Sequence, residues 1–422
     1  NKSHPTLGNA SEFVASRWEA AEASFDHAFE RWRTLYRSAN EERRAAAAIS
    51  DRLGISSQER KDARMRYNAA DKQLELLEKG VSSANSDFYT YRYLATEGFL
   101  PGYNFPRLPL YAFVPAGGSD TRAAFLQRAR FLAISEFGPR SLIYHEGRAY
   151  RVHKAKLPPG AVSPDGRSLA TEKVFICPNC GAAHQIERER CHACDSPMAG
   201  CMPIHKTLRI DNVERLPAER ITANDEERVR QGFEIQTVFA WPERKGRLDM
   251  TECHLVVENE KLATLQYANS AEIMRLNLGL KRRTEKTIMG FPIDPSTGRW
   301  ARLQDEVAEE DRDPDKAYPE RIVPVVHDRK NSLLIRFAKP DAWSLTAIAT
   351  AQHALLRGIE IVFQLEEGEI LGEPLPDREN RRAILFYEAT EGGAGVLGRI
   401  MREPDLLNRV IREALALMHY EN

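Results

Sequence analysis

The sequence predicts an α+β fold with an N-terminal helical hairpin, a compact four-cysteine module and a mixed α/β C-terminal domain. Three observations predict it: coiled-coil spacing of apolar residues over 11–80, two Cys-x-x-Cys pairs within 177–194, and a strand, a glycine-rich turn and a helix after residue 382. The 422 residues are enough for two to four domains, at about 100–200 residues per domain.

The composition is typical of a globular protein, with 42% hydrophobic and 29% charged residues. Because the net charge is −1, no global field favours nucleic acid, and any nucleic-acid surface has to be a local patch. No run of about 18 apolar residues predicts a membrane span, and no signal peptide is visible, so we expect no membrane partner. The chain begins Asn1-Lys2-Ser3 without Met, consistent with a trimmed chain or part of a longer one.

Residues 11–80 have the pattern of two helices. In the first, apolar residues follow the 4-3-4-3 spacing of a coiled-coil seam, at Val14, Trp18, Ala21, Phe25, Ala28, Trp32 and Leu35. Ser56-Ser57-Gln58-Glu59 predicts a capping box that starts the second helix, and Gly80 ends it. The seam aromatics favour a packed core over a cofactor box. We expect an antiparallel hairpin that serves as a strut or as an arm that docks a partner.

Cys177-Pro178-Asn179-Cys180 and Cys191-His192-Ala193-Cys194 form two knuckles that can direct four thiolates to one point. Cys177, Cys180, Cys191 and Cys194 are therefore candidate ligands of a tetrahedral Zn²⁺. Gly181 directly follows the first knuckle, where a sharp turn needs a residue tolerant of positive φ. The alternatives are a redox dithiol pair or coincidence, but a redox pair usually stands alone beside a βαβ pattern. Four thiolates leave no open coordination position, so the zinc is expected to be structural.

Two stretches concentrate cations. Residues 120–156 hold several arginines, including Arg128, Arg130 and Arg140, with interleaved Tyr144 and Tyr150. Such a mixture suits a nucleic-acid groove, and a solvated face with core tyrosines explains it equally well. A helix predicted at about 270–279 leads into Lys281, Arg282 and Arg283. Their role is either phosphate contact or compensation of the helix macrodipole.

The C-terminal part is predicted to alternate helices and strands. A helix from Ser344 to Arg357 closed by Gly358 is followed by a strand at 359–365. After a strand at 383–388, the turn 389–395 and a helix from Val396 have a geometry that can hold an anion, although glycines for a close backbone approach explain the turn better. A last helix opens at Pro404. Glu388 and Glu391 are carboxylates that a metal-dependent nuclease would use, but no further ligands stand at a readable spacing. Walker A, HExxH and GxSxG motifs are absent.

We expect the following division of the chain. It runs 1–84 helical hairpin or coiled-coil arm, 85–170 basic irregular and β segment, 171–203 four-cysteine, zinc-ribbon-like module, 204–341 β-rich domain, and 342–422 α/β C-terminal segment with the glycine-rich turn. Zinc knuckles without a wider disulfide framework fit a reducing cytoplasm.

Four stretches together resemble a known family. They are Phe-Leu-Pro-Gly-Tyr-Asn-Phe-Pro-Arg (99–107), Glu-Phe-Gly-Pro-Arg (136–140), the four cysteines and Tyr-Glu-Ala-Thr-Glu-Gly-Gly-Ala-Gly (387–395). They are similar to the C-terminal region of bacterial superfamily 2 DEAD/DEAH-box helicases of the MrfA (YprA-like) kind, which carries a four-cysteine zinc-binding domain. They also resemble the related stand-alone subunit of DISARM-type phage-defence systems. Family members often have Pro where this chain has Glu391, so the turn is assigned no ligand.

The resemblance implies a helicase-associated zinc-binding module that binds DNA and supports an ATP-dependent helicase or translocase, in phage defence or DNA repair. It implies structural Zn²⁺ on the four cysteines, and ATP only through a partner or a missing motor domain, because this chain has no ATPase motifs. The expected DNA contacts are Arg128, Arg130, Arg140, Lys281, Arg282 and Arg283. The alternative is a protein-interaction scaffold of a defence complex without DNA contact, and a metal-dependent nuclease is the third hypothesis.

Overall fold

The computed structural model describes residues 10–52, 54, 56–78, 90, 93–94, 99, 110–114, 124–145, 147–157, 161–163, 168–210, 212–220, 231–244, 246–302, 318–389 and 393–419. The chain divides into two compact units, Asn1–Leu108 and Pro109–Asn422. Most of the Phe99–Arg107 stretch, the acidic run 309–313 and Glu391 lie outside the described residues. Among the described helices, none is long and apolar enough to cross a membrane.

The first unit contains the predicted helical hairpin, built from α1 (Ala10–Ser50) and α2 (Ser57–Glu78). The predicted capping box is confirmed, because Ser56 Oγ accepts from Glu59 N at 3.1 Å while Glu59 Oε2 accepts from Ser56 N at 2.8 Å. Since α2 is about half the length of α1, it does not cover the whole seam. Trp18 is 81% exposed, against the expectation of a core position.

The second unit is built on two sheets and confirms the α+β class. The smaller sheet has the order β2-β1-β8-β4-β3. Its strands are β1 (Leu110–Val114), β2 (Ala124–Arg128), β3 (Leu142–His145), β4 (Arg148–Lys156) and β8 (Asn212–Arg220). A separate two-stranded ribbon pairs β10 (Glu243–Arg244) with β11 (Arg247–Leu248).

The larger sheet has ten strands, and its main path runs β12-β13-β15-β7-β5-β6. The strands on this path are β5 (Glu172–Ile176), β6 (Ala183–His184), β7 (Met202–Arg209), β12 (Thr251–Val257), β13 (Glu260–Leu280) and β15 (Glu320–Phe337). The others are β9 (Phe233–Ala240), β14 (Phe291–Ile293), β16 (Ile370–Pro376) and β17 (Arg381–Glu388). The long antiparallel pair β13–β15 lies at the centre of the sheet. Strands β9 and β12 pair with β13, and strands β7 and β17 pair with β15.

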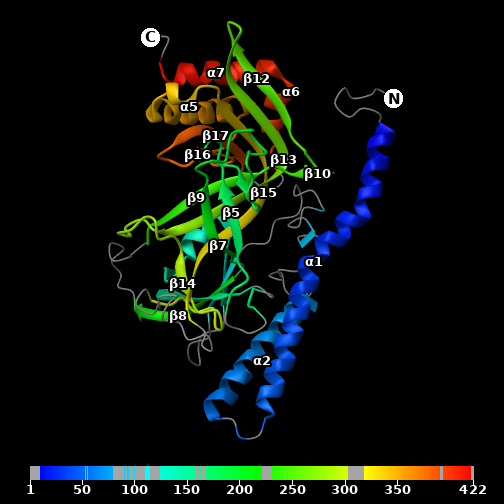
Figure 1. Cartoon of the computed structure of the whole chain (residues 1–422), viewed down its shortest axis with the longest axis vertical. Coiled ribbons are helices and arrows are strands. Elements are labelled where there is room, and N and C mark those ends of the chain that lie inside the picture. The colour runs from blue at the N-terminus through cyan, green and yellow to red at the C-terminus, as the bar shows by residue number, and fades with distance from the viewer. Residues whose placement is uncertain are drawn as a thin grey trace. The chain divides into compact units, whose positions relative to one another are not determined.

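Helices pack against this sheet in more than one place. They are α4 (Arg130–Glu136), η4 (Pro340–Ala342), α5 (Leu345–Phe363), α6 (Val396–Arg402) and α7 (Pro404–Leu417). Figure 1 shows α5 and α7 side by side over β16 and β17. Their shared core includes Ile348, Ile359, Ile384, Phe386 and Val410.

The helix predicted at 270–279 is wrong, because these residues belong to strand β13. Ala271, Ile273, Leu276 and Leu278 are all buried, since neighbouring strands and packed layers enclose β13. A strand buried on both faces has the continuous apolar character that a buried helix also shows.

The strand predicted at 359–365 is also wrong, because α5 continues through Gly358 to Phe363. The β-branched residues Ile359, Ile361 and Val362 favour a strand by propensity. Packing on α7 and the sheet overrides this preference. Gly358 does not end the helix. A Cβ at Gly358 would lie 2.5 Å from Val410 O, so glycine here permits close contact between α5 and α7.

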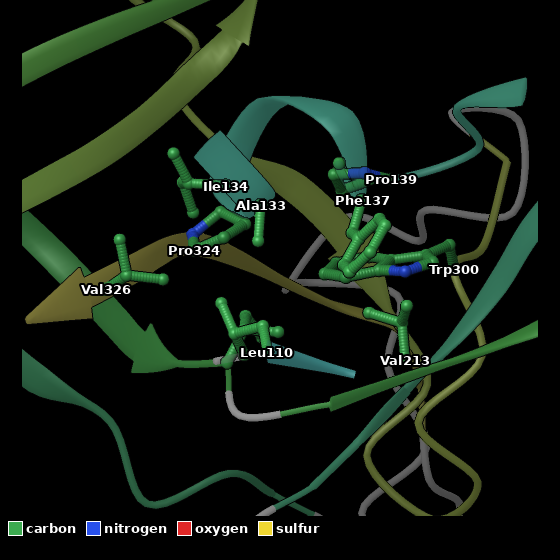
Figure 2. A pocket seen from close by; sticks show the side chains of 11 residues that line it. Leu110, Ala133, Ile134, Phe137, Pro139, Val213, Trp300, Pro324 and Val326 are labelled. Carbon is green, nitrogen blue, oxygen red and sulfur yellow. The ribbon is translucent and has the colours of Figure 1, made fainter. Parts of the chain in front are cut away.

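A small pocket lies between α4, β1, β8 and β15 (Figure 2). All of its lining residues are apolar, and they include Ile134 and Phe137 of α4, Val213 of β8 and Trp300. The 136–140 motif forms one wall, where Gly138 approaches the Phe233 ring so closely that a Cβ would lie 2.5 Å from it. With no charged group in its lining, this pocket is a feature of core packing.

Candidate metal centre and basic surfaces

The two cysteine knuckles adopt the same local structure. In the first, Gly181 N donates to Cys177 O at 3.0 Å and Cys177 N donates to Ala182 O at 2.9 Å. In the second, Asp195 N donates to Cys191 O and Cys191 N to Ser196 O, both at 2.9 Å. Gly181 (φ +74°) and Asp195 (φ +58°) hold the equivalent left-handed position, which confirms the positive φ predicted at Gly181.

The four sulfur atoms converge at one point. Cys177 Sγ lies 3.7 Å from Cys194 Sγ, Cys180 Sγ lies 3.6 Å from Cys191 Sγ, and all four fall within 4.8 Å of one another. A tetrahedron with Zn–S bonds of about 2.3 Å has S–S edges of about 3.8 Å. The donor set and its size therefore fit Zn²⁺, and four sulfurs would close the coordination sphere.

The cysteine thiols of the cluster shift one another's pKa values, because they form hydrogen bonds with one another. Hydrogen bonds from Cys180 and Cys191 lower the pKa of the Cys177 thiol to about 7, and those from Cys177 and Cys180 hold the pKa of Cys194 below its usual value. Burial raises the pKa of Cys180. A cation at the centre would favour the thiolate form of all four groups, so metal binding releases protons.

The cluster is packed into the large sheet. Cys177, Cys180 and Cys191 share a buried core with Phe239 of β9, Ala268 of β13 and with Leu375, Leu385 and Tyr387 of β16 and β17. A Cβ at Gly181 would lie 3.0 Å from the Leu375 side chain and 3.1 Å from Pro376 Cα. The cysteine module is therefore continuous with strands that come almost 200 residues later in the chain.

Two histidines stand beside the cluster. The rings of His184 and His192 lie 4.3 Å apart, and burial together with His192 lowers the pKa of His184 to about 4. His184 is neutral at physiological pH as a result. Neither ring joins the convergent group that the cysteines form in the described part of the chain.

The first group of predicted DNA contacts is largely occupied by internal interactions. Arg128 Nε donates to Glu136 Oε2 at 2.6 Å, and Arg130 Nη1 donates to His327 O at 3.2 Å. Arg140 adopts a left-handed φ of +63° in the turn after α4. The structure therefore holds Arg128 and Arg130 against protein groups.

The second group, 281–283, lies in the loop after β13. Lys281 and Arg282 are exposed, and their side chains have no bond to other described residues. Arg283 differs, since its Nη1 donates to Glu234 Oε2 at 2.6 Å and its Nη2 to Lys286 O. Lys286 Nζ also reaches Glu234 Oε2, at 3.2 Å. Glu234, which the sequence did not single out, thus neutralises part of this basic loop, defined here as Lys281–Lys286.

The glycine-rich turn does hold an anion, but the anion is internal. Glu388, 1% exposed, accepts from Gly395 N and Leu397 N at 3.1 Å each and from Asn331 Nδ2 at 2.9 Å. Both carboxylate oxygens are thereby used inside the fold. The expectation that the glycines serve a tight backbone approach is confirmed at Gly393, where any Cβ would overlap the Glu388 carboxylate.

The fold and the site define an α+β protein with a closed four-cysteine centre built into its main sheet. Residues 351–419 match the family model of the MrfA Zn-binding domain, so the C-terminal region of this chain is MrfA-like. The matched segment contains no cysteine itself. Within the matched segment, strands β16 and β17 pack against the four-cysteine cluster.

A search of solved structures finds a crystal structure of the DUF1998 helicase MrfA bound to DNA. The identity is 9%, the match covers 71% of this chain and 28% of that chain, and the TM-score is 0.30. This TM-score establishes no shared fold, and the chain spans under a third of that protein. No curated protein matches the chain.

Proposed function

We propose that this chain is a helicase-associated module in which structural Zn²⁺, bound by Cys177, Cys180, Cys191 and Cys194, stabilises a DNA-contacting fold. One observation carries the proposal: the four sulfurs converge at tetrahedral spacing against the segment that matches the MrfA Zn-binding domain. When bound, the metal supplies cohesion between the two knuckles and performs no chemistry. ATP hydrolysis belongs to a partner or motor domain, and the resemblance implies DNA repair or phage defence as the setting.

The basic loop Lys281–Lys286 supplies the DNA contact in this proposal. Lys281 and Arg282 are exposed and carry charge that no described carboxylate neutralises, which suits phosphate binding. Arg128, Arg130, Arg140 and Arg283 contribute less, since three of them already bond to protein groups. The helical hairpin of α1 and α2 is proposed to dock the motor.

The experiment measures zinc content by elemental analysis and DNA affinity by fluorescence anisotropy at two salt concentrations. The double variant Lys281→Ala/Arg282→Ala is expected to bind DNA more weakly and with a salt slope lower by about 1–2. The matched control is Arg409→Ala/Arg412→Ala, which removes two exposed cations from α7. Equal affinity of the two double variants would remove the loop from the proposal. A chain that contains no zinc after purification with zinc would refute the metal site.

The alternative, a protein-interaction scaffold without DNA contact, is favoured by the net charge of −1 and by the internal pairing of Arg128 and Arg283. Absence of any DNA binding at low salt would support it. The nuclease hypothesis loses its main carboxylate, because Glu388 is buried and saturated by hydrogen bonds. Mg²⁺-dependent cleavage that survives Glu388→Gln would exclude Glu388 as its ligand.

A further inference from the structure

Each cysteine knuckle is held from outside at the same position. Asn179 is the third residue of the first knuckle, and its Oδ1 accepts from Arg382 Nε of β17 at 3.2 Å. Ala193 is the third residue of the second knuckle, and its carbonyl oxygen accepts from Gln266 Nε2 of β13 at 2.8 Å. Two strands of the large sheet, β17 and β13, therefore each form a hydrogen bond to one knuckle of the candidate metal centre.

Arg382 fixes the orientation of the Asn179 amide. Because a guanidinium only donates, the oxygen of Asn179 has to face Arg382 and its NH₂ has to face the other way. That NH₂ points to the second knuckle, with Nδ2 2.9 Å from Ser196 Oγ and 3.9 Å from Cys194 Sγ. Arg382 is itself anchored, since Nη2 donates to Asp341 Oδ2 at 2.7 Å. Arg382 and Asn179 thus form a relay that links β17 to a ligand sulfur.

Gln266 is oriented by the same logic. Its Nε2 donates to Glu252 Oε2 at 2.7 Å as well as to Ala193 O, and a carboxylate only accepts. Gln266 is 1% exposed, so its amide has little freedom to turn away. The second knuckle is therefore tied to β13 through a buried hydrogen bond, independent of the relay on the first knuckle.

We propose that Arg382 and Gln266 are positioning residues that hold the two knuckles at the sulfur spacing of the metal-bound state. This rests on zinc binding by the four cysteines, as proposed above. Four thiolates repel one another when no cation lies between them. A fold that already holds the four sulfurs close together before the metal arrives therefore binds the metal more tightly. Partners of this kind usually change metal affinity by about 10–100-fold. The cysteine-free segment 351–419 thus contributes to the metal centre through Arg382 rather than through ligands.

The test is chelator competition on the zinc-loaded full chain, read with a chromogenic chelator. Arg382→Met, Asn179→Ala and Gln266→Met are each expected to lower zinc affinity about 10–100-fold. The matched control is Arg381→Met, because Arg381 is the neighbour of Arg382 on β17 but bonds to Gln352 Oε1 instead of the knuckle. Its affinity should equal that of the unmodified chain.

A double-mutant cycle separates the relay from a general loss of stability. If Arg382 acts through Asn179, Asn179→Ala/Arg382→Met binds zinc no more weakly than either single variant. Additive losses, or losses equal to that of Arg381→Met, would overturn the proposal. The visible spectrum of the Co²⁺-substituted variants should keep the bands of tetrahedral thiolate coordination, which shows that all four ligands still bind. An unmodified chain without zinc affinity would instead refute the proposed function itself.

Discussion

The Glu388 carboxylate occupies the space beside Gly393 that a Cβ atom would need. Gly393 has φ +67°, and the chain turns there around the carboxylate and then presents Gly395 N and Leu397 N to it. A buried anion at the start of α6 satisfies backbone donors that would otherwise have no partner. Glu388 and the glycines of the turn are one structural unit.

Glu388→Gln is expected to destabilise the chain by roughly 1.5–3 kcal/mol, because an amide replaces a charged acceptor of buried N–H groups. Urea unfolding followed by circular dichroism measures the change. An unchanged midpoint would mean that the carboxylate does not hold the turn.

Gly393→Ala is expected to lower the free energy of unfolding by more than the roughly 1–2 kcal/mol that a positive φ alone costs an alanine. The control is Gly246→Ala, since Gly246 has φ +74° and open space around its Cβ position. The difference between the two variants reports the clash with Glu388, expected at roughly 1–3 kcal/mol. Equal losses of stability in the two variants would show that Glu388 does not occupy the space beside Gly393 in solution.

Gly358→Ala should destabilise the chain although alanine favours helices by about 1 kcal/mol over glycine. The added Cβ would lie 2.5 Å from Val410 O and would force α5 away from α7. Thermal unfolding of this variant and of Thr350→Ala, an exposed helix position, measures the contrast. A higher melting temperature for Gly358→Ala would contradict the close helix contact.

Glu234→Gln is expected to strengthen DNA binding and to raise its salt slope by about 1. The change frees Arg283 and Lys286, whose charges Glu234 neutralises at 2.6 and 3.2 Å. Anisotropy titrations at two salt concentrations measure the effect. No gain in affinity, with a normal melting curve, would separate these two cations from the DNA surface.

The ion pairs of Glu234 should also make the stability of the chain depend on pH. Burial opposes ionisation of Glu234, but hydrogen bonds from Arg283 and Lys286 outweigh it and hold its pKa below the usual value. The stability from these pairs is therefore present above the unfolded pKa of about 4.3 and is lost as pH falls through the lower folded pKa. Urea midpoints between about pH 5 and pH 3 should fall more steeply in the unmodified chain than in Glu234→Gln.

Removal of zinc should lower the stability of the sheet as well as of 171–203, because Cys177 and Cys180 share a core with Leu375 and Tyr387. Cys191→Ser is expected to reduce bound zinc from about one per chain and to lower the melting temperature. Elemental analysis and differential scanning fluorimetry test this together. Cys253→Ser, at an exposed cysteine outside the cluster, should change neither.

The sequence by itself determined what depends on local spacing. The hairpin helices, the capping box at Ser56, the paired knuckles, the positive φ at Gly181 and the helix that begins at Pro404 all follow from residues within a few positions of one another. Ligand convergence was also predictable, since two Cys-x-x-Cys turns need only one short connection to meet.

Only the tertiary structure decided what depends on distant neighbours. Residues 270–279 are a strand because β9 and β15 enclose them, and 359–363 are helical because α7 packs against them. The roles of Glu234, Arg382 and Gln266 depend on distant neighbours in the same way. Their partners come from other strands and turns, and a side chain carries no local sign of which charge or carbonyl the folded chain will bring beside it.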